Sequence, residues 1–182
     1  MFKQSAILAL CFFCWLAQPV GAAVYLTQAE FLRGAFVNPP SPQTVWLRGA
    51  LRDQVKQILG HRYAALRIRY WQQEDPPGGP ARTAWILEEI GKELPITAGF
   101  VVSGSTIESA QVLAFRESRG GEVRYPAFTR QFDGLSLSDQ LGLSATIDGI
   151  SGATLSVSAM RRMARLALYL HQHVTLDEPA AD

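Results

Sequence analysis

Cysteine is nearly absent from this chain, and its absence excludes several kinds of site. The 182-residue sequence has two cysteines, Cys11 and Cys14, and both lie in an apolar stretch close to the first residue. The remainder of the chain therefore offers no disulfide, no thiolate metal site and no cysteine nucleophile.

The chain also lacks an excess of charge of either sign. It has 17 Lys and Arg against 16 Asp and Glu, and the two counts become equal when Lys3 is left out. A nucleic-acid binder would need clustered basic residues to neutralise phosphates. The neutral balance argues against nucleic acid as a partner and indicates that a local site carries the function.

Several enzyme motifs are missing as well. There is no Gly-rich dinucleotide fingerprint, and Gly149 to Gly152 lacks the second glycine that a Gly-x-Ser-x-Gly nucleophile elbow requires. The three histidines, His61, His171 and His173, show no triad pattern. Because His171 and His173 are two residues apart on a predicted helix, they would point in different directions. We therefore expect surface histidines and no metal site.

The first 22 residues predict an export signal. Lys3 provides a positive start, Ala6 to Leu16 form an apolar segment too short to span a bilayer, and Val20-Gly21-Ala22 has the small residues of a cleavage site. Cleavage after residue 22 would leave 160 residues, enough for one domain with a sizeable core. We expect a periplasmic or otherwise extracytoplasmic protein; an uncleaved membrane anchor and a lipid-modified cysteine are the alternatives.

Two helices are expected after this leader. Thr27 followed three residues later by Glu30 has the pattern of a capping box, which predicts a short helix to about Phe36. Apolar residues at helical spacing predict a second helix from Val45 to Leu59, ending at Gly60.

The middle of the chain changes its hydrophobic period from about 3.6 to 2, which is typical of strands. The predicted strands are Ala65–Trp71, Ala84–Leu87, Ile96–Val102 and Ile107–Phe115, with a loop over Gln72–Pro80 and a hairpin turn at Gly104. A short helix is expected over Pro126–Gly134. Antiparallel strands with helices before and after them predict an α+β fold, an antiparallel sheet packed with helices in a single domain.

The longest predicted helix follows Thr154 and runs to about His171. Its apolar residues, Met160 and Met163 among them, recur at helical spacing and are expected in the core, while three arginines lie off that stripe. Thr154 or Ser156 is the natural N-cap, a contribution of about 1 kcal/mol. Unpaired backbone N–H groups and the helix dipole also make this end suitable for a phosphate.

The segment Arg116–Arg124 has two interpretations. It is densely charged yet contains the pair Gly120-Gly121. It is either a solvated turn or a loop whose glycines allow the backbone to approach a ligand closely.

Three stretches resemble FMN-binding domains that are modified by a flavin transferase, including flavin-bearing subunits of sodium-translocating quinone reductase and Rnf-type complexes. Asp148-Gly149-Ile150-Ser151-Gly152-Ala153-Thr154 is similar to the motif Asp-x-x-Ser/Thr-Gly-Ala-Thr/Ser. Trp85–Thr97 resembles a strand followed by Gly-Lys-x-x-Pro-Ile-Thr, although Leu94 stands where the family often has an acidic or another polar residue. Arg116–Arg124 with Gln131-Phe132 resembles the segment Arg-Glu-Ser/Thr-x-Gly-Gly-Glu-Val-Arg.

This resemblance implies FMN as the cofactor, esterified through its phosphate to the hydroxyl of Thr154. It also implies that Asp148 is required by the transferase. The turn Ser151, Gly152 and Ala153 would surround the phosphate, and no residue is assigned a catalytic role. The residues expected close to the flavin are Glu117, Gly120, Gly121 and Trp85.

The function expected from the resemblance is that of an exported electron carrier. Residues 1–22 would be the signal peptide, 23–174 the FMN-binding domain and 175–182 a disordered acidic tail. Its partners would be a flavin transferase for maturation and a membrane-bound electron-transfer protein. The alternatives are a flavin-dependent reductase with its own substrate and a flavin-free binding module in which Thr154 is an N-cap.

Overall fold

The computed structural model describes residues 23–74 and 78–176. The predicted signal peptide and residues 177–182 of the predicted tail lie outside these ranges. Strands and helices follow one another in the order β1 (Ala23–Val24), α1 (Gln28–Ala35), β2 (Gln43–Trp46), α2 (Gly49–Leu59), β3 (Arg67–Glu74), β4 (Ala81–Ile90), β5 (Pro95–Ser103), β6 (Thr106–Phe115), the 3₁₀ helix η1 (Gly121–Arg124), α3 (Pro126–Thr129), the 3₁₀ helix η2 (Arg130–Phe132) and α4 (Thr154–Leu176).

The strands form one six-stranded sheet in the order β1-β6-β5-β4-β3-β2. Every neighbouring pair is antiparallel, and β4 to β6 are joined in chain order. The sheet is packed with helices, which confirms the predicted α+β class.

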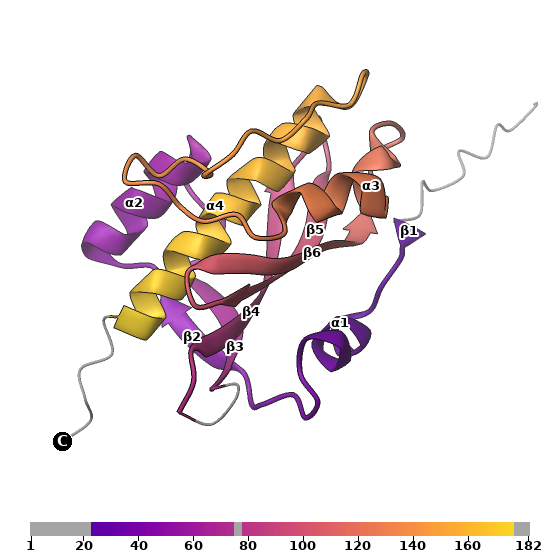
Figure 1. Ribbon diagram of the computed structural model, residues 1–182. Coiled ribbons are helices and arrows are strands. Elements are labelled where there is room, and N and C mark those ends of the chain that lie inside the picture. The colour runs from indigo at the N-terminus through magenta and orange to yellow at the C-terminus, as the bar shows by residue number, and fades with distance from the viewer. Residues whose placement is uncertain (1–22, 75–77, 177–182) are drawn as a thin grey trace, which may run out of the picture.

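The two faces of the sheet are covered by different helices (Figure 1). The long helix α4 crosses one face with α2 beside it, and most of the buried apolar side chains lie between these helices and the sheet. The other face carries a smaller cluster, in which Phe31 and Leu32 of α1 pack over Ala84 and Val101. Phe31 lies so close to Gly99 of β5 that an added Cβ would be 2.5 Å from its ring.

Helix α1 starts as the capping box predicts. The Thr27 hydroxyl oxygen accepts a hydrogen bond from the backbone N–H of Glu30 at 3.2 Å, and the Glu30 carboxylate accepts one from the N–H of Thr27 at 2.8 Å. Both groups thereby satisfy donors that a helix start leaves unpaired.

The predicted helix from Val45 is wrong in its first turn. Val45 and Trp46 belong to β2, where Val45 pairs with Ile68, and α2 starts at Gly49. Buried Val45 and Leu47 alternate with exposed Trp46, a period of 2 that the following helical pattern obscured.

The central hairpin is longer than its side chains suggest. Gln72 to Glu74, predicted as loop, continue β3, and Glu74 pairs with Ala81 at the start of β4. Backbone hydrogen bonds hold such a ladder together, so polar side chains that face solvent do not end it. Strands β5 and β6 and the turn at Gly104 agree with prediction to within one residue.

Helix α4 has the predicted buried stripe, including Met160 and Met163, but His171 departs from expectation. Its imidazole is 2% exposed, with Nδ1 at 2.7 Å from the Thr83 hydroxyl and Nε2 at 2.5 Å from the carbonyl oxygen of Gly104. The surface-histidine prediction is therefore wrong for His171, because the helix phase turns this residue toward the sheet. The helix continues to Leu176, so the first two residues of the predicted tail are helical.

Within residues 23–74 and 78–176, no helix has the length and apolar character needed to cross a membrane.

Candidate functional site

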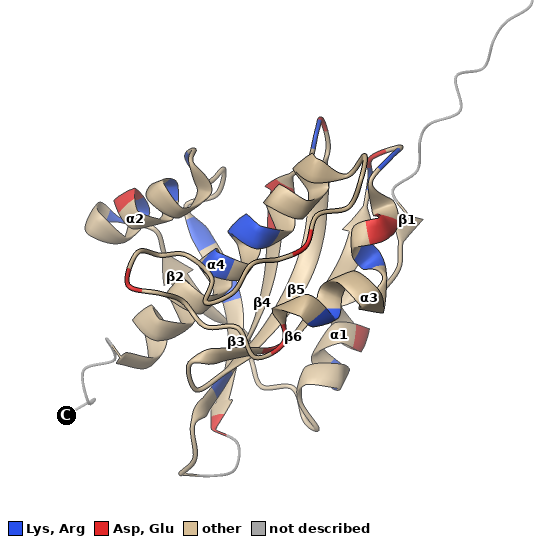
Figure 2. Ribbon diagram, turned by 45° about the horizontal axis from the view of Figure 1, so that its top comes forward, with Lys and Arg blue, Asp and Glu red and all other residues tan. Residues whose placement is uncertain are grey.

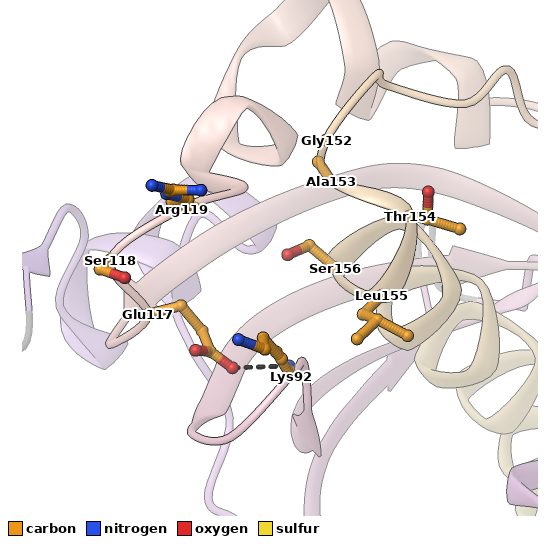
Figure 3. A pocket seen from close by; sticks show the side chains of 9 residues that line it. All are labelled: Lys92, Glu117, Ser118, Arg119, Gly152, Ala153, Thr154, Leu155 and Ser156. Carbon is orange, nitrogen blue, oxygen red and sulfur yellow. Dashed lines mark hydrogen bonds between the residues drawn. The ribbon is translucent and has the colours of Figure 1, made fainter.

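A cleft of about 610 Å³ lies at the first turn of α4. It is bounded by three segments that are far apart in the sequence: the turn between β4 and β5, the loop after β6 and the start of α4 (Figure 3). Its lining consists of Lys92, Glu117, Ser118, Arg119, Gly152, Ala153, Thr154, Leu155 and Ser156. The structure thus brings together parts of all three stretches that carry the family resemblance.

Thr154 is the first residue of α4 and is exposed at the edge of this cleft (Figure 3). The first helical hydrogen bond runs from the N–H of Val157 to the carbonyl oxygen of Ala153 at 2.9 Å, which makes buried Ala153 the N-cap. The N-cap prediction for Thr154 or Ser156 is therefore wrong. No hydrogen bond joins the Thr154 side chain to another described residue, so its hydroxyl is available for chemistry.

The turn before Thr154 is held by backbone contacts. The N–H of Asp148 donates to the side-chain oxygen of Gln131 at 2.7 Å, and the N–H of Ala153 donates to the carbonyl oxygen of Ile150 at 3.0 Å. Gly152 has φ of +79°, and a Cβ built there would meet no atom within 4 Å. Its glycine is thus explained by backbone conformation, and the space beside the turn is open.

The predicted residues of this turn fall into two groups. Gly152, Ala153 and Thr154 line the cleft, whereas Asp148 and Ser151 are exposed outside its lining. An exposed Asp148 suits recognition by another protein better than contact with a ligand held in the cleft.

Gly120 sets how closely the loop after β6 approaches α4. Its φ is +85°, and a Cβ built there would lie 2.5 Å from the hydroxyl oxygen of Ser156 and 3.4 Å from the Cβ of Ala153. Neighbouring Gly121 starts η1, and a Cβ there would meet its nearest atoms at 3.6 Å, an ordinary contact. Of the two glycines, Gly120 is the one that the geometry of the cleft requires.

Glu117 ties that loop to the turn between β4 and β5. One carboxylate oxygen accepts backbone hydrogen bonds from Lys92 and Glu93 at 2.6 Å each and from Leu94 at 2.9 Å (Figure 3). Partial burial raises the pKa of Glu117, but the three backbone N–H groups together outweigh it, and the pKa is held below its usual range. Glu117 therefore occupies this backbone nest itself and acts as a clamp on one wall of the cleft.

Replacing Glu117 with Gln is expected to weaken this clamp. At pH 7 the free energy of unfolding should fall by about 1 kcal/mol, because charge-assisted hydrogen bonds become neutral ones at a partly solvated site. A lowered folded-state pKa stabilises the fold above the unfolded-state value near 4.3 and is lost as the pH falls through the folded-state value. Urea unfolding should therefore separate the wild type from Glu117→Gln at pH 7 and much less at pH 3; an equal separation at both pH values would contradict the clamp.

Trp85 does not line the cleft. It is fully buried in β4, stacked on Tyr70 at 4.8 Å between ring centroids, and its indole N–H donates to the Thr83 hydroxyl at 2.8 Å. Its position in the central core accounts for a tryptophan here, so the predicted closeness to a ligand finds no support in this placement.

The cleft combines positive charge with an apolar surface. Lys92 and Arg119 are exposed on its rim, and the α4 N-terminus adds unpaired backbone N–H groups. Leu155, 52% exposed, offers an apolar contact beside Thr154. A ligand with a phosphate at one end and an apolar ring at the other fits this lining, and the volume lies within the usual range for cofactor sites.

The sequence pattern did not single out Lys92, Arg119, Leu155 or Gln131 as individual site residues. The first three lie inside or beside the matched motifs, but their side chains meet only because β4–β5, the loop after β6 and α4 converge. Gln131 had a signal in the Gln131-Phe132 pair of the third motif, and its role is to hold the backbone of Asp148.

Comparison with known protein families matches residues 91–169 to the FMN-binding domain. Every residue of the cleft lies within that range. Two similar solved structures are NqrC of Shewanella oneidensis, at 16% identity and a TM-score of 0.57 over 79% of this chain and 84% of that one, and a subunit of the Na⁺-translocating NADH-quinone reductase of Parabacteroides distasonis, at 18% identity and a TM-score of 0.50 over 79% and 80%. At these identities the likeness shows a shared fold. A search of curated proteins finds no match.

Proposed function

Since residues 91–169 place the chain in the FMN-binding domain family, with FMN as its cofactor, we propose that it is an exported electron-transfer flavoprotein whose FMN is esterified to Thr154. The observation that carries the proposal is the position of Thr154. Its exposed hydroxyl, without a partner among the described residues, stands on the first turn of α4 at the edge of a cleft that suits a phosphate and a ring.

The residues around Thr154 have distinct tasks in this proposal. The open turn at Gly152 leaves room for the phosphate, and the α4 N-terminus with Lys92 and Arg119 offsets its negative charge. Leu155 supplies an apolar surface for the ring. Bound FMN supplies reversible electron transfer, while the protein positions the group and tunes its surroundings.

A covalent bond solves a retention problem that this cleft would otherwise have. A helix N-terminus favours a phosphate by about 0.3–1 kcal/mol, or up to about 2 kcal/mol when partly buried, whereas a micromolar site needs about 8 kcal/mol. The cleft is open and its cations are exposed. An ester makes retention independent of noncovalent affinity, which matters outside the cytoplasm because lost flavin would be hard to replace there.

Two partners follow from this proposal. A flavin transferase would form the ester, and exposed Asp148, six residues before Thr154 on a turn held by Gln131, is positioned for its recognition. A membrane-bound electron-transfer protein would exchange electrons with the flavin. Support for the second partner comes from the names of the similar structures, one of which belongs to a Na⁺-translocating NADH-quinone reductase.

The intact mass of the full chain tests the proposal. Protein coexpressed with a competent flavin transferase and directed for export is expected to gain the mass of FMN less one water, to fluoresce on a denaturing gel and to lose the mass of residues 1–22. Protein made without the transferase is the control. An unmodified mass after coexpression would favour a flavin-free module, whereas rapid reoxidation of the reduced, loaded protein by a small molecule alone would favour a reductase.

A further inference from the structure

A second cleft, of about 410 Å³, lies farther along α4, between this helix, the end of α2 and the segment before α4. Its lining includes Ser158, Arg161, Arg162 and Arg165 of α4, with Gly60 and Gly142 on the opposing segments. Neither the sequence motifs nor the FMN cleft includes any of these residues.

The α4 side chains of this cleft form one face of the helix. Ser158, Arg161, Arg162 and Arg165 are separated by three, four and seven positions, the spacing that stacks residues along one side. Figure 2 shows the basic segments in blue about midway along α4. Arg161 lies seven residues beyond Thr154, about 10 Å along the helix axis, so the cluster is separate from the first turn.

These arginines have less negative charge around them than they carry. Arg162 donates to the buried carboxylate of Glu89 at 3.1 Å, but that carboxylate oxygen also lies 2.8 Å from the His61 imidazole. Arg165 donates through Nε to the carbonyl oxygen of Leu141, an uncharged partner. Arg161 is exposed and has no partner among the described residues, so three guanidinium groups stand against one shared carboxylate.

Two further observations indicate that the cluster is under electrostatic tension. Burial, and then the positive charges of Arg161 and Arg162, lower the pKa of Arg165. The Nε of Arg162 is buried without a hydrogen-bond partner among the described residues. Both costs would be reduced by an anion placed between the guanidinium groups.

The bland explanation for the arginines is that they cap the carbonyl end of α2, which reaches this cleft at Ile58 to Gly60. The hydrogen bonds argue against it. Those of Arg162 go to Glu89 and Ile90, and that of Arg165 goes to Leu141, while the carbonyl of Lys56 is satisfied by the N–H of Gly60.

We propose that this arginine cleft is a second anion site, which binds a phosphate group between Arg161 and Arg165 with the Ser158 hydroxyl as an additional donor. Guanidinium groups match phosphate oxygens in pairs of hydrogen bonds, which distinguishes such a site from a general attraction for anions. The phosphate can come from inorganic phosphate or from a nucleotide. The proposal does not depend on the flavin or on its attachment to Thr154.

The test is a titration of the full chain with inorganic phosphate and, separately, with AMP, followed by NMR of backbone amides and arginine side chains at constant ionic strength set with chloride. The expected result is saturable shifts at Ser158 to Arg165 that chloride does not produce. Tighter binding of AMP than of phosphate would identify a nucleotide as the source, and equal binding would identify phosphate itself. Shifts confined to Lys92, Arg119 and residues 152–156 would place the anion in the FMN cleft and overturn the proposal.

Arg161→Gln is the main variant because its side chain is exposed and its loss removes no contact on which the fold depends. Phosphate affinity should fall at least tenfold in Arg161→Gln, with the circular dichroism spectrum and melting temperature unchanged, and Arg161→Lys should fall in between. Arg33→Gln on α1, which removes one exposed positive charge on the other side of the sheet, is the matched control and should bind like the wild type. Equal affinities in Arg161→Gln and Arg33→Gln, or no binding by the wild type, would refute the site.

Discussion

Thr154→Ala is expected to abolish covalent flavin completely. The substitution removes the oxygen that would form the ester, and Ala retains a high helix propensity at this first position of α4. Since the Thr154 hydroxyl makes no hydrogen bond to another described residue, its loss should change the free energy of unfolding by less than about 0.5 kcal/mol. Intact mass and in-gel fluorescence after coexpression with a flavin transferase measure the effect.

Two companion variants make the result specific to one oxygen. Thr154→Ser keeps a hydroxyl at the same place and should retain covalent FMN. Ser151→Ala removes the neighbouring exposed hydroxyl outside the cleft lining and should be labelled like the wild type. Label that persists in Thr154→Ala and disappears in Ser151→Ala would move the attachment to Ser151.

Gly120→Ala is expected to disturb the cleft through packing instead of chemistry. A Cβ at φ of +85° is strained, and it would lie 2.5 Å from the Ser156 hydroxyl oxygen on α4. The combined cost is about 1–3 kcal/mol in the free energy of unfolding, or roughly 3–9 °C in melting temperature for a domain of this size. The loop after β6 should also move away from α4, so flavin loading should fall although no ester-forming atom is changed.

The adjacent glycine supplies the control. Gly121→Ala adds the same methyl group where the nearest atoms are 3.6 Å away, and its melting temperature should match that of the wild type. In the double variant Gly120→Ala with Ser156→Ala, removal of the serine oxygen should restore part of the lost stability. Equal melting temperatures for Gly120→Ala and Gly121→Ala would show that close approach to α4 is not the reason for a glycine at position 120.

Local sequence patterns identified most of the fold correctly. The capping box at Thr27 and Glu30, the hairpin at Gly104 and the buried methionines of α4 depend on neighbouring residues, and all three are confirmed. The failures arose where a distant partner decides. Val45 is a strand residue because β3 pairs with it, and Gln72 to Glu74 extend a strand because β4 does.

The same division holds for the candidate site. The sequence by itself determined the hydroxyl, the small-residue turn and the helix that follows, because these features are adjacent in the chain and their chemistry is local. Tertiary structure alone decided that Ala153 is the N-cap, that Glu117 clamps the backbone of Lys92 to Leu94, and that Trp85 belongs to the core. It also decided the cleft itself, since three segments from different parts of the chain meet there only after the sheet and α4 have packed together.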